Sequence, residues 1–174
     1  AGSQRVIDLH GRLDQVKCLD CGHVTTREAI QNWIETHNEL PNTSALTLRP
    51  DGDADLPGHY VADFKVPQCE KCGGVVMPEV VFFGGTVPGL VVDEGYQMID
   101  AAEGMLVVGS SLSVYSGLRF CRYTVGQGKP LIILNQGQTR ADDLCTSKFS
   151  SSPFKLMAQC ADAVLTNGQE PRHG

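Results

Sequence analysis

The sequence predicts an α/β fold, in which a parallel sheet covered by helices is joined to a small metal-binding lobe. Two short apolar runs, "MLVV" at 105–108 and "LIIL" at 131–134, flank a helical pattern over roughly 116–126. A strand, a helix and a strand within about 30 residues form a crossover unit whose strands lie parallel. The second observation is a pair of Cys-x-x-Cys-Gly motifs, which is typical of a zinc-binding lobe.

The first half of the chain is predicted to begin with a strand over 5–10. A helix follows over 25–38, where Thr25 and Glu28 have the spacing of a capping box. Its apolar and aromatic positions repeat at helical spacing: Ile30, Trp33, Ile34 and His37.

The rest of the chain alternates loops, strands and helices. Residues 41–66 are rich in Pro, Gly and Asp, which predicts a loop-like insertion with an edge strand at 60–66. The run "VVFF" at 80–83, followed by Gly-Gly, predicts a buried strand. Helices are expected over 91–103 and about 153–165.

Two residues follow the predicted parallel strands at their carboxyl ends. Gly109 comes after strand 105–108, and Asn135 comes after strand 131–134. Carboxyl ends of parallel strands share one edge of the sheet, where open α/β sheets bind ligands. If strand 80–83 runs in the same direction, Gly84 joins this edge.

Charge and composition exclude two classes of partner. The 174 residues carry 14 Lys and Arg against 20 Asp and Glu, for a net charge of −6. No basic run is present, which argues against a nucleic-acid partner. No apolar stretch reaches the length of a membrane span, so no membrane partner is expected. Nothing in the sequence indicates an oligomeric state.

Four of the seven cysteines form the two paired motifs. Together they can complete a tetrahedral thiolate shell with no open position, which indicates a structural and not a catalytic zinc. The glycine after each pair, Gly22 or Gly73, suits the tight turn of a zinc knuckle. The alternative is two unrelated surface pairs. The predicted zinc ligands are Cys18, Cys21, Cys69 and Cys72. The other three cysteines, at 121, 145 and 160, are expected to be free thiols.

His10 lies eight positions before the first paired cysteine. Because four thiolates already fill the shell, His10 is not needed as a metal ligand. Spacing alone favours a structural histidine, with a catalytic role as the alternative.

Several stretches occur in one order along the chain: "LHG" at 9–11, the two "CxxCG" motifs, "PEVVFFG" at 78–84, "VVGSSLSVYSG" at 107–117 and "LIILN" at 131–135. Together they resemble the sirtuin family, the NAD-dependent protein deacylases. "VKCLDCG", "VVGSSLSVYSG" and "TRADDL" are most similar to its class II branch, which has mitochondrial and bacterial members of lipoamidase and ADP-ribosyltransferase type.

The resemblance implies a role for each site residue. His10 is expected to be the catalytic base that activates a ribose hydroxyl of NAD. The residues expected to contact NAD are Gly109, Ser110, Ser111 and Asn135. Those expected to form the acyl-lysine tunnel and peptide slot are Val81, Phe83 and Gly84 on one side, and Leu112, Ser113 and Val114 on the other. The substrate backbone is expected to add as a strand between these segments.

The residue types suit this chemistry. Histidine exchanges protons near neutral pH, as a base acting on a ribose hydroxyl must. Glycine and serine after a strand allow a nucleotide to approach the backbone, and asparagine offers a donor and an acceptor to a ribose diol. Read singly, each motif has a structural alternative: a capped strand–helix turn, a core strand and its turn, or the end of a strand.

The resemblance also implies the organisation of the chain. A Rossmann-like NAD-binding domain is expected from residues 1–16 and 77–174, incomplete at its N-terminus, with a zinc-ribbon lobe at 17–76. The family usually has an acidic residue after "FFG", where this chain has Gly85. The family's Gly-Ala-Gly-rich cofactor loop and Gln-Asn-x-Asp motif are not found in these residues, so the 174 residues alone are expected to be inactive.

The expected activity is transfer of an acyl group from protein lysine to ADP-ribose, with release of nicotinamide. The expected cofactors are NAD and zinc, and the expected partner is an acyl-lysine protein or peptide. The bacterial cytoplasm is the expected location, with the mitochondrial matrix as the alternative. The alternative functions are a non-catalytic zinc-ribbon interaction module and a sirtuin-type ADP-ribosyltransferase.

Overall fold

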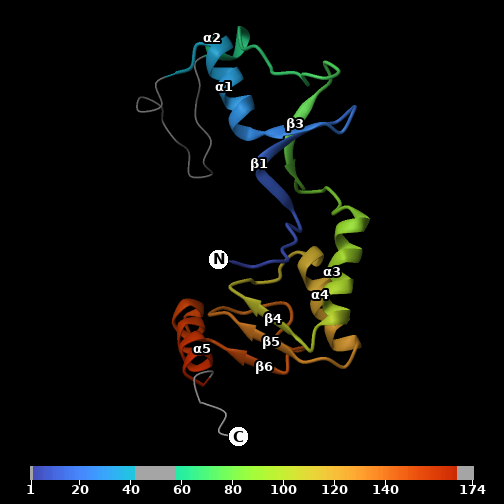
Figure 1. The fold of residues 1–174 in the computed structure, drawn as a ribbon, viewed down its shortest axis with the longest axis vertical. Helices are drawn as coiled ribbons and strands as arrows, with labels where there is room; N and C mark the ends of the chain where they lie inside the picture. The colour runs from blue at the N-terminus through green and yellow to red at the C-terminus, as the bar shows by residue number, and fades with distance from the viewer. Residues whose placement is uncertain (1, 42–57, 168–174) are drawn as a thin grey trace, which may run out of the picture. The chain divides into compact units, whose positions relative to one another are not determined.

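The computed structural model describes residues 2–41 and 58–167. The chain divides into two compact units, one of residues 8–86 and one of residues 1–7 together with 87–174. Figure 1 labels the main helices and strands of both units. The unit of residues 8–86 is larger than the predicted zinc lobe at 17–76. Residues 11–16 and 77–80, just outside that lobe, pair with each other and therefore belong to the same unit. Which unit carries which function stays a prediction.

The unit of residues 8–86 is built on a three-stranded antiparallel sheet in the order β2-β1-β3. Its central strand β1 spans Gly11–Cys18 and pairs on one side with β2, Val24–Thr26, and on the other with β3, Val76–Val80. Val16 and Cys18 are the buried residues of β1, while its first half is exposed. A shift of register between Arg12 and Val16 interrupts the pairing with β3.

The predicted strand over 5–10 is wrong, because the chain turns just before β1. The Gly11 N–H donates to the Asp8 carbonyl at 2.9 Å, which closes this turn. Gly11 has a φ of 82°, and a Cβ there would collide with the Glu79 carbonyl of β3. Only glycine fits this close approach without strain. The strand therefore begins after the turn.

The predicted strand at 80–83 is also wrong. The strand of this region is β3, five residues that end at Val80 and run antiparallel to β1. After it the chain turns, with the Gly85 N–H donating to the Phe82 carbonyl at 2.8 Å. Phe83 is fully exposed, so the apolar run is not a buried strand. Gly84 therefore does not join the edge of a parallel sheet.

Helix α1, Arg27–His37, confirms the predicted helix but begins differently. The cap is Thr26, whose hydroxyl accepts from the Ala29 N–H at 3.1 Å, so the prediction of Thr25 as the cap is wrong. Thr25 instead pairs with Val16 in the β1–β2 ladder. Asn38 ends the helix, and its amide also pairs with the backbone of Lys65.

A short helix replaces the predicted edge strand at 60–66. Helix α2 spans Gly58–Ala62, and the residues from 64 to 67 have no regular structure. Most of the predicted insertion at 41–66 lies outside the described residues.

The second unit contains a parallel three-stranded sheet in the order β4-β5-β6. Strands β4, Met105–Val108, and β5, Leu131–Leu134, match the predicted strands. Helix α4, Tyr115–Gly126, connects them, so the predicted crossover unit is confirmed. The third strand, β6, Ser147–Phe149, was not predicted, because three residues with a central lysine give no apolar run.

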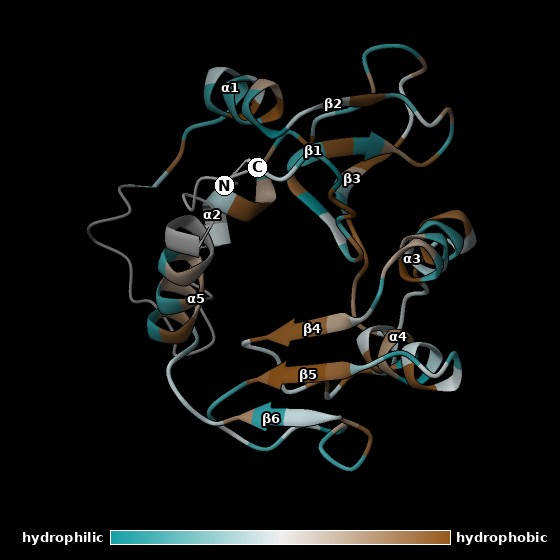
Figure 2. Ribbon diagram, turned by 60° about the horizontal axis from the view of Figure 1, so that its bottom comes forward, coloured by the Kyte–Doolittle hydropathy of each residue, from teal (hydrophilic) through white to brown (hydrophobic). Residues whose placement is uncertain are grey.

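One face of this sheet forms the core of its unit. Figure 2 shows β4 and β5 as strongly apolar strands and β6 as more polar. The buried cluster joins both strands to α4 and its flanking loops; its members are Val107, Leu112, Leu118, Cys121, Leu131, Ile133 and Ala141. The alternate residues of the two strands, Leu106, Val108 and Ile132, remain partly exposed.

Two further helices complete the second unit. Helix α3, Gly89–Ala101, packs on α4 through Tyr96, whose ring centroid lies 5.3 Å from that of Phe120 and 4.5 Å from that of Tyr123. Helix α5, Pro153–Asn167, confirms the last predicted helix. Among the described helices, none has both the length and the apolar character needed to cross a membrane.

Replacing the α1 cap should destabilise the unit of residues 8–86. We expect Thr26→Ala to lower the free energy of unfolding by about 1 kcal/mol, because the Ala29 N–H loses its acceptor. Thr26→Ser keeps a hydroxyl and should lose much less. Urea unfolding can be followed by the fluorescence of Trp33, the single tryptophan, which lies on α1. An unchanged urea midpoint in Thr26→Ala would contradict the cap.

Candidate functional site

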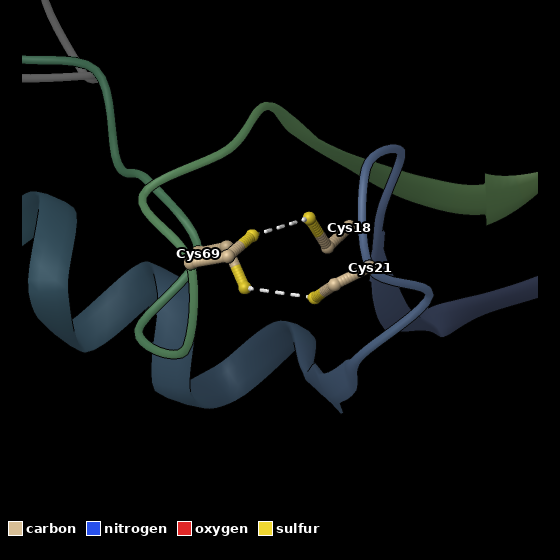
Figure 3. Close-up of side chains that lie close together, drawn as sticks. Cys18, Cys21 and Cys69 are labelled. Atoms are coloured by element: carbon tan, nitrogen blue, oxygen red, sulfur yellow. Dashed lines mark hydrogen bonds between the residues drawn. The ribbon is translucent and has the colours of Figure 1, made fainter.

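Four cysteine thiols meet at one end of the antiparallel sheet. The ligand atoms of Cys18, Cys21, Cys69 and Cys72 all lie within 4.8 Å of one another. Figure 3 shows the sulfurs of Cys18 and Cys21 directed at sulfurs on the facing turn. The structure thus brings together the four predicted metal ligands. It is the only cluster of metal-ligating side chains found among the described residues.

The spacing of the sulfurs suits a zinc ion. The Cys18 and Cys72 sulfurs lie 3.6 Å apart, and those of Cys21 and Cys69 lie 3.7 Å apart. A disulfide would need about 2.0 Å. A tetrahedral shell with Zn–S distances of about 2.3 Å has sulfur–sulfur edges of about 3.8 Å. The four thiols could therefore hold zinc with little movement.

Each half of the cluster is a tight turn with the same hydrogen bonds. The Gly22 N–H donates to the Cys18 carbonyl at 3.1 Å, and the Gly73 N–H donates to the Cys69 carbonyl at 2.8 Å. Gly22 and Gly73 have φ values of 71° and 73°, although a Cβ at either position would meet no atom. Glycine is therefore required by backbone conformation and not by space.

Two thiols of this cluster, Cys18 and Cys72, have pKa values shifted in opposite directions. The backbone N–H of Cys21, with smaller help from neighbouring thiols, lowers the pKa of Cys18 to about 7. For Cys72, the backbone N–H of Gly74 acts in the same direction, but the neighbouring thiols outweigh it and raise the pKa to about 12. The two thiols lie against neighbouring sulfurs of the same cluster. A bound dication would displace the thiol protons and leave thiolate ligands.

A polar contact that the sequence did not indicate joins the two turns. The His23 Nε2 lies 2.8 Å from Glu70 Oε1, and each residue belongs to a different cysteine turn. Asp20 also links the turns, because its carboxylate accepts from the Val75 N–H at 3.2 Å. These contacts fix the spacing of the turns. No sequence signal identifies them, since the partners are about 50 residues apart.

His10 lies at the opposite end of β1 from the thiols. Its carbonyl accepts from the Val81 N–H at 2.8 Å, which extends the β1–β3 ladder by one bond. Strand β1 has eight residues, which at about 3.3 Å per residue span roughly 26 Å. His10 is therefore separated from the metal cluster by the length of the strand. This geometry agrees with the expectation that His10 is not needed as a metal ligand, which stays a prediction.

The segment after β3 carries three of the predicted substrate residues, Val81, Phe83 and Gly84, and it begins beside His10. Val81 is paired with His10, and the turn over 82–85 follows directly. Phe83 is fully exposed, and Gly84 has a φ of 82° with open space where a Cβ would lie. An exposed aromatic ring beside a tight turn is available to a ligand. The assignment of these residues to substrate stays a prediction.

The predicted NAD-contacting residues meet at the carboxyl edge of the parallel sheet. The Gly109 N–H donates to the Leu134 carbonyl at 3.0 Å, and the Asn135 N–H donates to the Phe149 carbonyl at 3.1 Å. Gly109 and Asn135 thus stand on neighbouring strands, and their predicted shared edge is confirmed. Gly109 has a φ of 62°, and no atom lies within 4 Å of where its Cβ would be. This open space lets a nucleotide approach the backbone.

The loop that follows Gly109 is held by its own side chains. The Ser110 hydroxyl accepts from the Leu112 N–H at 3.2 Å, and the hydroxyls of Ser111 and Ser113 are hydrogen-bonded at 2.7 Å. Leu112 is buried, whereas Ser113 and Val114 are exposed. The loop leads into the first turn of α4. The loop therefore has exposed polar side chains and is anchored in the core through Leu112.

Arg140 is a site residue that sequence reasoning missed. Its backbone N–H donates to the Ser111 carbonyl at 3.0 Å, and its guanidinium donates to the Ser113 carbonyl at 2.6 Å. The only signal was the stretch "TRADDL", in which nothing points to a partner 27 positions earlier.

The remaining cysteines lie in the other unit. Cys121 is fully buried on α4, and burial raises the pKa of its thiol, so it is suited to packing and not to reactivity. Cys145 is partly buried and its thiol contacts the Asp142 carbonyl, while Cys160 is exposed on α5.

Comparison with known proteins identifies several similar sequences and structures. The Sir2 family model matches residues 1–116. An NAD-dependent protein deacetylase from Bordetella bronchiseptica is 45% identical over 161 residues, covering 91% of this chain and 58% of that protein. The mitochondrial NAD-dependent protein lipoamidase sirtuin-4 of Bos taurus is 46% identical over 157 residues, covering 90% of this chain and 50% of that protein.

The fold is shared with solved structures of the same kind. A structure of Sir2 with a p53 peptide and NAD⁺ has a TM-score of 0.69 and 27% sequence identity, covering 93% of this chain and 56% of that one. The chain thus spans about half to three-fifths of the length of these proteins.

Removing one thiol should release the metal. We expect Cys69→Ala to lose most of a bound zinc, because three thiolates cannot complete the tetrahedral shell. Cys160→Ala removes an exposed thiol outside the cluster and should keep one zinc per chain. Elemental analysis after dialysis measures both variants. Tightly bound zinc in Cys69→Ala would show that another residue is the fourth ligand.

Proposed function

The chain belongs to the Sir2 family, and from this premise we propose that it carries the catalytic base and much of the binding site of an NAD-dependent protein-lysine deacylase. In this activity an acyl group passes from lysine to ADP-ribose, and nicotinamide is released. The similar deacetylases and lipoamidase support the reaction class.

The observation that carries the proposal is the position of His10. It is exposed, its backbone is fixed by the bond to Val81, and it is far along β1 from the thiol cluster. The imidazole of His10 is therefore an exposed group at the end of β1 away from the thiol cluster. A general base must be positioned before it can act efficiently.

The roles proposed for the protein's own side chains follow from their chemistry. When bound, NAD would supply the ribose: its C1′ would take the acyl oxygen as nicotinamide leaves, and a ribose hydroxyl oxygen would finally carry the acyl group once the bond to the lysine nitrogen has broken. His10 would accept a proton from a ribose hydroxyl, so that the hydroxyl oxygen becomes nucleophilic. Histidine suits this task because it can take up and release a proton near neutral pH.

The edge of the parallel sheet is proposed to hold part of NAD. The open space at Gly109 allows close approach to the backbone, and Ser110 and Ser111 supply hydroxyls beside it. The Asn135 amide donates to the Gly137 carbonyl at 3.0 Å, which orients it and leaves its oxygen to accept from a ribose hydroxyl.

The acyl-lysine substrate is proposed to contact two segments. Val81, Phe83 and Gly84 lie beside His10 in one unit, and Leu112, Ser113 and Val114 form the loop before α4 in the other. The substrate backbone is proposed to add as a strand, which is how β-augmentation gives affinity without strict sequence requirements. The peptide complex of a similar Sir2 protein supports this partner class.

Zinc is proposed to act in structure only. The four thiols leave no position for substrate, and the thiol cluster is separated from His10 by the length of β1. The boundaries proposed for the functional domains remain 1–16 with 77–174 for NAD and 17–76 for zinc. We propose the bacterial cytoplasm as the location, supported by the bacterial relative and by reduced metal-binding thiols, with the mitochondrial matrix as the alternative.

Replacing the proposed base should stop catalysis without releasing metal. In a protein extended to the full length of the relatives, we expect His10→Ala to reduce nicotinamide release about 10²–10⁴-fold, because the proposed acceptor of the ribose proton is removed. The matched control is His37→Ala, which removes an exposed histidine from α1. Assays with acetyl-lysine and lipoyl-lysine peptides, together with zinc analysis, make the measurement.

Three outcomes would contradict this proposal. Loss of zinc in His10→Ala would place the residue in the metal site. Failure of the unaltered full-length protein to bind NAD in a calorimetric titration would favour the non-catalytic zinc-ribbon module. NAD cleavage that labels a protein with ADP-ribose instead of removing an acyl group would favour the transferase alternative.

A further inference from the structure

We propose that Arg140 is a positioning residue for the peptide-binding side of the loop over 110–114, and that it acts on peptide affinity far more than on NAD affinity. This inference rests on the proposed function, since it names a residue that tunes the proposed substrate site. Arg140 bridges two carbonyls of the loop, those of Ser111 and Ser113.

The loop needs such support because it contains an unfavourable backbone conformation. Leu112 has a φ of 55°, the only positive φ of a non-glycine residue among those the structure describes. A non-glycine residue in this region is sterically strained and persists only where its surroundings impose it. The two carbonyls that Arg140 holds belong to the residues on either side of Leu112. The side chain of Leu112 is also buried in the core cluster.

Arg140 itself stands on a rigid support. The Thr139 hydroxyl donates to the Asp142 carboxylate at 2.6 Å and accepts from the Ala141 N–H at 3.2 Å. Lys148 of β6 donates to the same carboxylate at 2.6 Å. Lys148 lowers the pKa of Asp142, so this ion pair persists at neutral pH. The backbone of Arg140 is therefore fixed without help from its own side chain, which is exposed.

The two bonds made by Arg140 differ in what they depend on. The bond to Ser111 comes from the backbone N–H and survives any substitution except proline. The bond to Ser113 comes from the guanidinium and is lost when the side chain is shortened. Ser111 belongs to the proposed NAD side of the loop, and Ser113 to the proposed peptide side. A change of side chain at 140 should therefore release the peptide side alone.

The bond to Ser113 does not block a peptide. A carbonyl oxygen has two lone pairs, so the Ser113 carbonyl can accept from Arg140 and from a second donor. Bonds from a charged donor are stronger than neutral ones, which makes the guanidinium an effective anchor. Holding the loop in place before binding removes the cost of ordering it in the complex.

The test compares substrate constants in Arg140 variants of the full-length protein. We expect Arg140→Ala to raise the KM and the Kd for an acetyl-lysine peptide about tenfold, as expected for loss of a charged hydrogen bond. The Kd for NAD and the kcat should change less than twofold. Arg140→Lys keeps a cationic donor and should recover part of the peptide affinity. Lys155→Ala, an exposed charge on α5, is the matched control and should change neither constant.

The outcomes separate this inference from the proposed function. Equal weakening of NAD and peptide in Arg140→Ala, with no recovery in Arg140→Lys, would show general destabilisation and overturn the inference. Unchanged peptide constants would overturn it as well. If the unaltered protein binds neither NAD nor the peptide, the proposed function itself fails. Thermal unfolding of each variant checks that the fold is retained, and Arg140→Gln serves if Arg140→Ala does not fold.

Discussion

The meeting of four thiols at one end of β1 is the constraint on which the antiparallel unit depends. Cys18 ends β1, and Cys72 lies just before β3, so an ion held by both motifs would tie together the two strands that form the longest ladder. The ladder extends to its far end, where the backbone of His10 meets that of Val81. A metal bound to the thiols would thus help to fix the backbone of His10 without contacting that residue. Zinc-binding free energy in such a site is largely folding free energy.

The second unit is organised by a different constraint, the shared carboxyl edge of parallel strands. Gly109 and Asn135 reach this edge because β4 and β5 are in register over their whole length. The loop after Gly109 turns back into the core through Leu112, whose backbone would not adopt its conformation alone. Arg140 donates to two carbonyls of this loop, and the Asp142–Lys148 pair holds the segment that carries Arg140. Binding groups on loops are effective when rigid elements support them in this way.

The sequence predicted those features that rest on local patterns. Both apolar strands of the parallel sheet, the crossover helix and the four thiols could be predicted, since apolar runs and paired cysteines are local signals. Strand β1 could not, because its first half is exposed on both faces and shows no apolar alternation. Phe82 and Phe83 suggested a buried strand, but the turn at Gly84 and Gly85 exposes both rings. Arg140 was missed because its partners come from a distant part of the sequence.

The most direct test of this account is X-ray absorption at the zinc edge of the zinc-loaded chain. The account predicts four sulfur neighbours at about 2.3 Å and no nitrogen or oxygen neighbour. This result would leave His10 outside the metal shell and available to a substrate, as the length of β1 requires. A nitrogen neighbour at about 2.0–2.1 Å that disappears in His10→Ala would contradict it, because His10 would then bind the metal and the separation of metal from catalysis would be lost.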